Sequence, residues 1–270
     1  IMSCRPFYQG FSAVNRLSRL GLYTGLLLGS LSTAPQALAA LEAEYVPQVQ
    51  ALIDAAKAGD RQAIAEQISY PLQREYPLPD VQNSQQLLMR FQQVFDSKLL
   101  SQIANSTTES NWETMGWRGI MLDHGSVWLD FDGKISGINY QSPEEAKLRG
   151  ELIAQQKAML HESVREFASP ELAWETARFI IRVDALDRQQ YRYAAWAKGK
   201  SMSEKPDLVL KKGKLVLDGN GGNHSFQFKS GPYLYVCDVI VLSAEERPIG
   251  ELLVYKNDQL LVQEAVVKAL

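Results

Sequence analysis

From about Arg178 to Ala265, apolar and polar residues alternate with a period of two, the pattern of strands that bury one face of a sheet. The alternation runs through RFIIRVDA, QYRYAAW, DLVLKKGKLVLD, HSFQFKSGPYLYVCDVIVL and GELLVYKNDQLLVQEA. Turn signals divide these stretches into roughly eight strands. The turns are Asp187-Arg188, Lys212-Gly213, Ser230-Gly231-Pro232 and Asn257-Asp258. This number and spacing predict an all-β sandwich or barrel domain.

Upstream of this region helical and strand patterns alternate, so the protein as a whole is predicted to be α+β. LEAEYVPQVQALIDAAKAGD spaces its apolar residues as one helix face, and we expect Gly59 to end this helix and Asp60 to cap the next. A further helix is predicted from Asn83 or Ser84 to about Ile103, because a broad apolar stripe runs along it.

Residues 115–140, MGWRGIMLDHGSVWLDFDGKISGINY, are predicted to form three antiparallel strands. If DHG is a three-residue loop, Arg118 faces Asp130 across the first hairpin, with Ile120 opposite Trp128 on the same face. The opposite face is then wholly apolar and suited to the core. It consists of Trp117, Gly119, Met121, Val127, Leu129 and Phe131.

The first 39 residues have the features of a secretory signal peptide: Arg16 and Arg19, the apolar run LGLYTGLLLGSL, and a small-residue cleavage site before Ala40. A membrane anchor is the alternative, but the run is shorter than the ~20 residues a span needs. The prediction is therefore a periplasmic or secreted protein with no membrane insertion after cleavage. Four segments follow: the signal peptide over 1–39, an α+β domain over 40–142, a linking helix over 143–176 and the β domain over 177–270.

Charge and cysteine content limit the possible partners of the protein and the ways in which its fold can be stabilised. Without the three arginines of the signal segment, 25 Lys and Arg face 31 Asp and Glu, a net charge of −6 that argues against nucleic acid as a partner. Cys237 is then the only thiol, so the fold must be stabilised by its core. Cys237 lies within an apolar run typical of a central strand, where a thiol stays protonated. The adjacent Asp238 must then be paired, neutral or directed into a cavity, and pairing with Arg182 or Arg192 is the favoured explanation.

The sequence contains no motif for a metal, a cofactor or a nucleophile. His124, His161 and His224 fall in a predicted turn, helix and strand without ligand spacing. The glycine-rich DGNGGNHS leads into a strand instead of a helix, so it is interpreted as a loop or bulge and not as a phosphate-binding loop. The sequence therefore predicts no cofactor, no metal site and no assembled catalytic set.

The segments LIDAAKAGDRQAIAEQISYPL and WRGIMLDHGSVWLDFDGKISGINY resemble the NTF2-like, or SnoaL-like, cone fold over residues 41–140. The whole chain also resembles exported bacterial proteins of no assigned function that share a GWRGIML segment and a β-rich tail ending in VYKN. The cone fold implies a curved antiparallel sheet with a pocket between sheet and helices. Members use that pocket as isomerases and dehydratases, for small ligands or for protein contacts, so the fold alone assigns no function.

The mixed face of the first hairpin is the predicted ligand-binding site. It gathers Trp112, Arg118, Trp128, Asp130 and Tyr140. Asp130 and Tyr140 could act as an acid–base pair, but Arg118 opposite Asp130 would keep the carboxylate ionised and weaken it as a base. Simple cross-strand pairing of Arg118 and Asp130 is the favoured interpretation.

The leading functional hypothesis is a non-enzymatic periplasmic protein that binds a small apolar molecule or another protein. One alternative is a cofactor-independent NTF2-like lyase or isomerase that uses Asp130 and Tyr140, which requires these two residues to share one cavity. Another is an inhibitor of a partner protein. It predicts an exposed apolar patch near GNGGNH or near the hairpin that carries Trp196.

Overall fold

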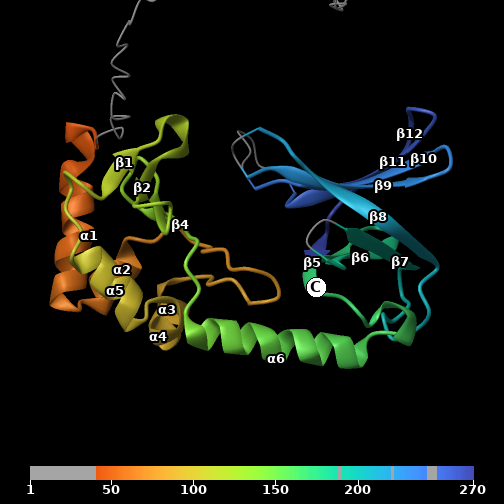
Figure 1. The fold of residues 1–270 in the computed structure, drawn as a ribbon, viewed down its shortest axis with the longest axis horizontal. Coiled ribbons are helices and arrows are strands. Elements are labelled where there is room, and N and C mark those ends of the chain that lie inside the picture. The colour runs from red at the N-terminus through yellow and green to blue at the C-terminus, as the bar shows by residue number, and fades with distance from the viewer. Residues whose placement is uncertain (1–40, 188–189, 220–221, 242–247) are drawn as a thin grey trace, which may run out of the picture. The chain divides into compact units, whose positions relative to one another are not determined.

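The computed structural model describes residues 41–187, 190–219, 222–241 and 248–270 (Figure 1). The signal-peptide prediction lies outside these residues. The described chain mixes helices with two antiparallel sheets, one of four strands and one of nine. Within the described ranges no helix is both long and apolar enough to cross a membrane.

The first helices follow their local signals. A 3-10 turn, Ala43–Tyr45, leads into α1, Val46–Ala58, which ends at Gly59 in the left-handed conformation, φ 65°. Asp60 then caps α2, Arg61–Glu66, by accepting a hydrogen bond from the Ala63 N–H at 3.0 Å. Both boundary predictions are confirmed.

The helix predicted from residue 84 to about 103 is present in three pieces: α3, Ser84–Met89; α4, Phe91–Val94; and α5, Ser97–Ala104. The chain leaves helical geometry at Phe95, and Asp96 caps α5 by accepting from the Leu99 N–H at 2.9 Å. The predicted apolar stripe is nevertheless buried against the small sheet. It includes Leu87, Phe91, Val94, Phe95, Leu99 and Ile103.

The small sheet has the order β1-β2-β3-β4, with β1, Trp112–Thr114; β2, Ile120–Leu122; β3, Val127–Leu129; and β4, Ile135–Ile138. The predicted register of its first hairpin is wrong by one residue, because Leu122 pairs with Val127 and Met121 with Trp128. The loop therefore holds four residues, with both Asp123 and Gly125 at positive φ.

The shift reverses the buried face of β2 only, while Val127 and Leu129 of β3 are buried as predicted. The buried residues are Ile120, Leu122, Val127 and Leu129, whereas Trp117 and Phe131, both predicted to be buried, are 62% and 41% exposed. The observed register places branched aliphatic residues from both strands on one side, which packs more tightly against the helices than a face with two large aromatics.

After the small sheet, Ser142 caps α6, Pro143–Met159, and a 3-10 turn, Glu162–Val164, follows. The linking helix predicted over 143–176 is wrong at its C-terminal end. Ser169–Glu175 forms strand β5 there instead of a helical turn. Leu172 and Trp174 of this strand join the core of the large sheet, and that burial outweighs the weak helical pattern.

The large sheet continues with β6, Phe179–Ala185; β7, Tyr191–Ala197; β8, Leu208–Leu217; β9, His224–Ser230; β10, Tyr233–Val239; β11, Gly250–Lys256; β12, Gln259–Ala265; and β13, Lys268–Ala269. Its order is β12-β11-β10-β9-β8-β7-β6-β5-β13. The Val266 N–H donates to Gly250 O at 2.9 Å, and the Val267 N–H donates to Glu175 O at 2.8 Å. The sheet therefore curls until its two edge strands, β12 and β13, are joined by Val266 and Val267 alone (Figure 1).

The predicted turn at Lys212-Gly213 is wrong, since β8 is continuous there and bulged. From Leu210 to Gly213 the strand advances three residues while its partner β7 advances two, from Tyr193 to Tyr191. The extra residue is taken up at Lys212, whose φ is 65°. The turn at Asn257-Asp258 is confirmed, with both residues at positive φ between β11 and β12.

Candidate functional site

A cavity of about 390 Å³ opens on the inner face of the curled sheet. Its walls come from β6, β7, β8, β10, β11 and β12 and are almost entirely apolar; they include Phe179, Tyr193, Ala195, Leu208, Tyr235 and Val254. These residues are far apart in the sequence, and only the curl of the sheet brings them around one space.

Small side chains on β7 create the hollow. Alternation along this strand turns Tyr193, Ala195 and Ala197 to the inner face. Ala195 pairs with Ile181 on one side and with Leu208 on the other, so a methyl group stands between two large aliphatic side chains. The space that a larger residue would fill at this position is left open to a ligand.

Tyr193 is a deeply buried residue of the cavity wall that carries a polar atom. The residue is 2% exposed, and its ring lies 5.5 Å from Phe228 and 5.7 Å from Tyr235 between centroids. Burial raises the pKa of this phenol well above its usual value, so the hydroxyl stays neutral and can donate a hydrogen bond. Over the described residues, no hydrogen bond to this hydroxyl is found. The hydroxyl oxygen is not fully enclosed by protein, so it can donate to a polar atom of a molecule bound in the cavity.

Glu264 fastens the curl beside the cavity. On β12 it pairs with Leu252 of β11, which lines the cavity, and it accepts hydrogen bonds from the Thr176 hydroxyl at 2.6 Å and from the Arg178 guanidinium. Desolvation raises the pKa of Glu264, but these hydrogen bonds outweigh it and leave the pKa below its usual value. Glu264 thus holds β12 to the turn between β5 and β6, and it has no proton to offer a ligand at neutral pH.

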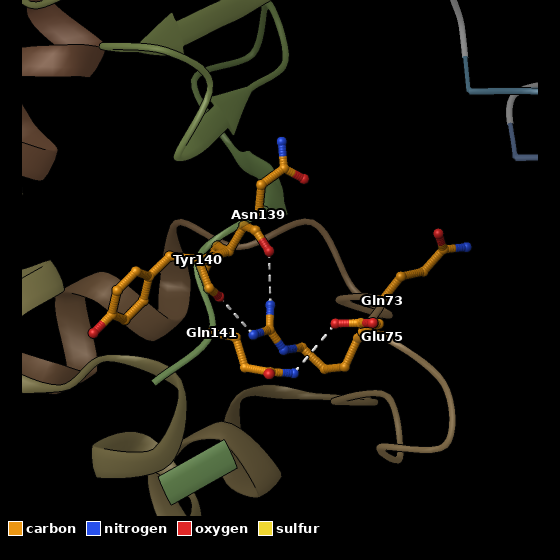
Figure 2. Close-up of a pocket in the computed structure, with 7 residues that line it drawn as sticks. Gln73, Glu75, Asn139, Tyr140 and Gln141 are labelled. Atoms are coloured by element: carbon orange, nitrogen blue, oxygen red, sulfur yellow. Dashed lines mark hydrogen bonds between the residues drawn. The ribbon is translucent and has the colours of Figure 1, made fainter. Parts of the chain in front are cut away.

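A second, polar pocket of about 330 Å³ lies beside the end of β4 (Figure 2). Arg74 lines it, but its donors are already used: the guanidinium donates to the carbonyls of Ile138 and Tyr140, both at 2.9 Å, and pairs with the buried Glu145. An arginine saturated in this way holds the structure together and has little left for a ligand.

Tyr140 lies at this pocket through its backbone. Figure 2 shows its ring turned away from Gln73, Glu75 and Gln141. Its hydroxyl donates to Asp96 Oδ2 at 2.6 Å, and burial, with the Asp96 carboxylate, raises the pKa of Tyr140 to about 12. The phenol is therefore a protonated donor that is already engaged.

The other predicted ligand-binding residues make separate contacts. Trp112 is buried in the core and its indole N–H donates to Ser106 Oγ at 2.9 Å. Arg118 lies in a 3-10 turn with its guanidinium 5.7 Å from the Trp128 ring centroid, so the predicted pairing of Arg118 with Asp130 is replaced by a cation–π contact. A cross-strand pair was not possible in the observed register, because β2 begins only at residue 120.

Asp130 caps the second turn of the small sheet. Its Oδ1 accepts from the backbone N–H of Asp132 at 3.1 Å and of Lys134 at 2.9 Å. Asp130 and Tyr140 thus have different partners, and no described contact joins them. The structure brings Arg118 and Trp128 together but does not gather the five predicted residues around one cavity.

Cys237 is fully buried in β10, and burial raises the pKa of its thiol, as expected for an inert core cysteine. The predicted partners of Asp238 are wrong, because Arg182 and Arg192 each form a 2.7 Å ion pair with the buried Asp184. Within the part of the chain that the structure describes, no group of His, Cys, Asp and Glu is arranged to hold a metal ion.

Sequence reasoning missed the cavity although one signal for it was present. QYRYAAW places small residues where the alternation requires a core-facing side chain, but a small residue also fits a tightly packed position.

Comparison of the chain with models of protein families, with curated proteins and with solved structures finds no match.

Proposed function

We propose that this protein is a non-enzymatic binding protein for a small, mainly apolar molecule, which it holds in the cavity of the curled sheet. The observation that carries the proposal is the Tyr193 hydroxyl, which has no protein partner over the described residues, is not fully enclosed by protein and belongs to a mainly apolar cavity wall. The cavity volume of about 390 Å³ falls within the ~300–1,000 Å³ typical of small-molecule sites.

The composition of the wall defines the ligand. Aliphatic and aromatic side chains favour an apolar body, since each Å² of apolar surface removed from water contributes ~25 cal/mol. The neutral Tyr193 hydroxyl favours one hydrogen-bond acceptor on that body, such as a carbonyl, an ether or a hydroxyl oxygen. The charged residue among those that line the cavity is Asp207, which is exposed and already paired with Lys200, so a charged group of the ligand would stay at the solvent end.

The proposal includes an export signal over residues 1–39 and an NTF2-like fold for residues 40–142, with the large sheet regarded as a barrel. The support for the second point is that α1, α2 and the α3–α5 region pack with the four-stranded antiparallel sheet into one hydrophobic cluster. The support for the third is that β12 and β13, the two edge strands of the large sheet, are joined by Val266 and Val267 alone.

The test is fluorescence titration of the purified protein with N-phenyl-1-naphthylamine, a small apolar fluorophore. We expect saturable binding to wild type and loss of binding in Ala195→Leu and Ala195→Phe, which fill the hollow. The matched control is Ala265→Phe, the same change at an exposed position of β12. Folded Ala195 variants that bind the fluorophore as wild type does would exclude the cavity as the site.

Native mass spectrometry of the protein taken from its producing cells then asks which molecule is retained. Tyr193→Phe removes only the hydroxyl oxygen, so we expect it to weaken retention of a ligand that carries an acceptor while leaving fluorophore binding intact. Equal retention by wild type and Tyr193→Phe would remove Tyr193 from the recognition of the ligand.

One observation favours a protein partner as a second candidate function. Leu215, Val216 and Leu217 are exposed at the end of β8, next to the segment GNGGNH, and Leu217 is 72% exposed. The sequence predicted an exposed apolar patch either near GNGGNH or near the hairpin that carries Trp196. An exposed Trp196 is ruled out, because Trp196 is buried and its indole N–H donates to Glu204 O at 2.8 Å. Capture of a protein that is lost in Leu217→Ser would support this candidate.

A further inference from the structure

Four lysines share a hollow of about 300 Å³ on β8 and β9, outside the cavity of the curled sheet. The residues that line the hollow are Lys211, Lys212, Lys214, Gln227, Lys229 and Leu234. Four of the six side chains are cationic and none is acidic, in a chain whose formal net charge is −3. Charges are mixed elsewhere along the sequence, so this concentration of one sign needs a physical explanation.

The bulge in β8 brings the lysines together. In a regular strand Lys211 would point to the face opposite Lys212 and Lys214. Leu210 and Gly213 are both buried, however, and the extra residue between them leaves Lys211 and Lys212 together on the outer side.

Gly213 is required for this geometry. A Cβ at that position would lie 2.0 Å from the ring of Phe228, so only glycine lets the strand run this close to the core. The sheet then adds the fourth lysine: Lys214 pairs with Gln227 on β9, and Lys229 lies two residues further along the same strand.

The four ammonium groups have no counter-charge of their own. Among the described residues, none of the four takes part in an ion pair, whereas Lys147, Lys157, Lys198, Lys200 and Lys256 have carboxylate, carbonyl or aromatic partners. Like charges that line one hollow repel each other, and a bound anion would relieve that repulsion. Gln227 uses one amide N–H on Ser225 Oγ at 3.1 Å, so a second N–H is left on the same wall.

We infer that Lys211, Lys212, Lys214 and Lys229 form a binding site for a phosphate group. Phosphate carries up to two charges on oxygen atoms that accept from several directions, which suits ammonium donors converging from two strands. The volume of about 300 Å³ also admits part of the molecule that carries the phosphate, next to the apolar Leu234. This inference does not rest on the proposed function, because the hollow and the cavity lie on different faces of the sheet.

The phosphate could belong to a soluble compound or to a lipid headgroup, and the experiment has one arm for each. Isothermal titration with pyrophosphate at low ionic strength measures the soluble arm. Co-sedimentation with phosphatidylglycerol vesicles, with phosphatidylcholine vesicles as the neutral reference, measures the lipid arm. Both use the full chain, the double variant Lys214→Gln/Lys229→Gln, and the control Lys57→Gln/Lys205→Gln, which removes the same charge from exposed positions elsewhere.

We expect wild type and control to bind in one of the two arms, and the hollow variant to bind at least tenfold more weakly in that arm. Binding of pyrophosphate assigns the site to soluble phosphates, and binding only of phosphatidylglycerol vesicles assigns it to a headgroup. The inference is overturned if wild type binds in neither arm, or if the control loses as much affinity as the hollow variant, since that would reflect net charge alone. Leaving Lys212 in place avoids a substitution at a left-handed residue, and circular dichroism checks that both variants fold.

Discussion

Removal of one partner of the Arg74–Glu145 pair should cost far more stability than removal of any surface ion pair. Glu145 lies in the first turn of α6 with a side chain 0% exposed, and the Arg74 side chain is 3% exposed. Arg74 also donates to the carbonyls of Ile138 and Tyr140, so it joins α6, the end of β4 and its own loop at one point. The perturbations are Arg74→Met, Glu145→Leu and the double variant.

The contacts in the structure set the expected loss of unfolding free energy in each variant. In Arg74→Met the nearest remaining cation is Arg90, 3.9 Å from Glu145 Oε1, and two buried carbonyls lose their donor. Breaking a buried pair costs ~3–5 kcal/mol, and Arg74→Met should lie at the lower end because Arg90 still offsets part of the Glu145 charge. Glu145→Leu should cost a similar amount because it leaves Arg74 without its counter-charge. The double variant should cost less than the two single variants added together, with a coupling of ~2–3 kcal/mol.

The assay is urea unfolding at neutral pH, followed by circular dichroism, on wild type and the three variants. Lys147→Met serves as the control, since Lys147 and Glu151 form an exposed pair at 4.0 Å on the same helix and its loss should have little measurable effect. Single variants that each lose less than ~1 kcal/mol, as surface pairs do, would refute the reasoning. Additive losses in the double variant would refute the coupling.

Three further outcomes are expected in the large sheet. Gly213→Ala forces a methyl group against the buried Phe228 ring and should cost at least ~1–3 kcal/mol in thermal unfolding, so an unchanged midpoint would contradict the described packing. Cys237 should resist iodoacetamide in the native protein and react in urea, which peptide mapping detects, because burial both covers its thiol and raises its pKa. The pKa of Glu264 is held below its usual 4.5, so its contribution is present above that value and is lost as the pH falls through the lowered pKa. Glu264→Gln should therefore flatten the acid side of the stability profile, and an unchanged profile would show that the hydrogen bonds from Arg178 do not lower this pKa.

The cavity of the curled sheet was not predicted from the sequence. Composition and the lack of catalytic motifs led to the hypothesis of apolar-molecule binding, and the residues predicted for it lay on the first hairpin. That choice rested on a register in which Arg118 faced Asp130, and a loop one residue longer removes it. The same limit applies to Asp238, whose predicted partners instead pair with Asp184 on β6.

Local chemistry in the sequence was sufficient to determine the elements that depend on neighbouring residues. Gly59 ends α1 and Asp60 caps α2, while Asn257-Asp258 turns the chain between β11 and β12, because backbone conformation and capping hydrogen bonds act within a few residues. The alternation of the second half likewise determined that it forms strands with one buried face.

Tertiary structure alone decided how those elements combine. The hairpin register, the extra residue in β8, the closure of the sheet by the C-terminal segment and the space beside Ala195 depend on contacts between residues far apart in the chain. Several registers satisfy the same alternation of apolar residues, and the choice among them is made by packing density and by the burial of whole faces. No short stretch of sequence contains that information, and both the cavity and the lysine hollow exist because of it.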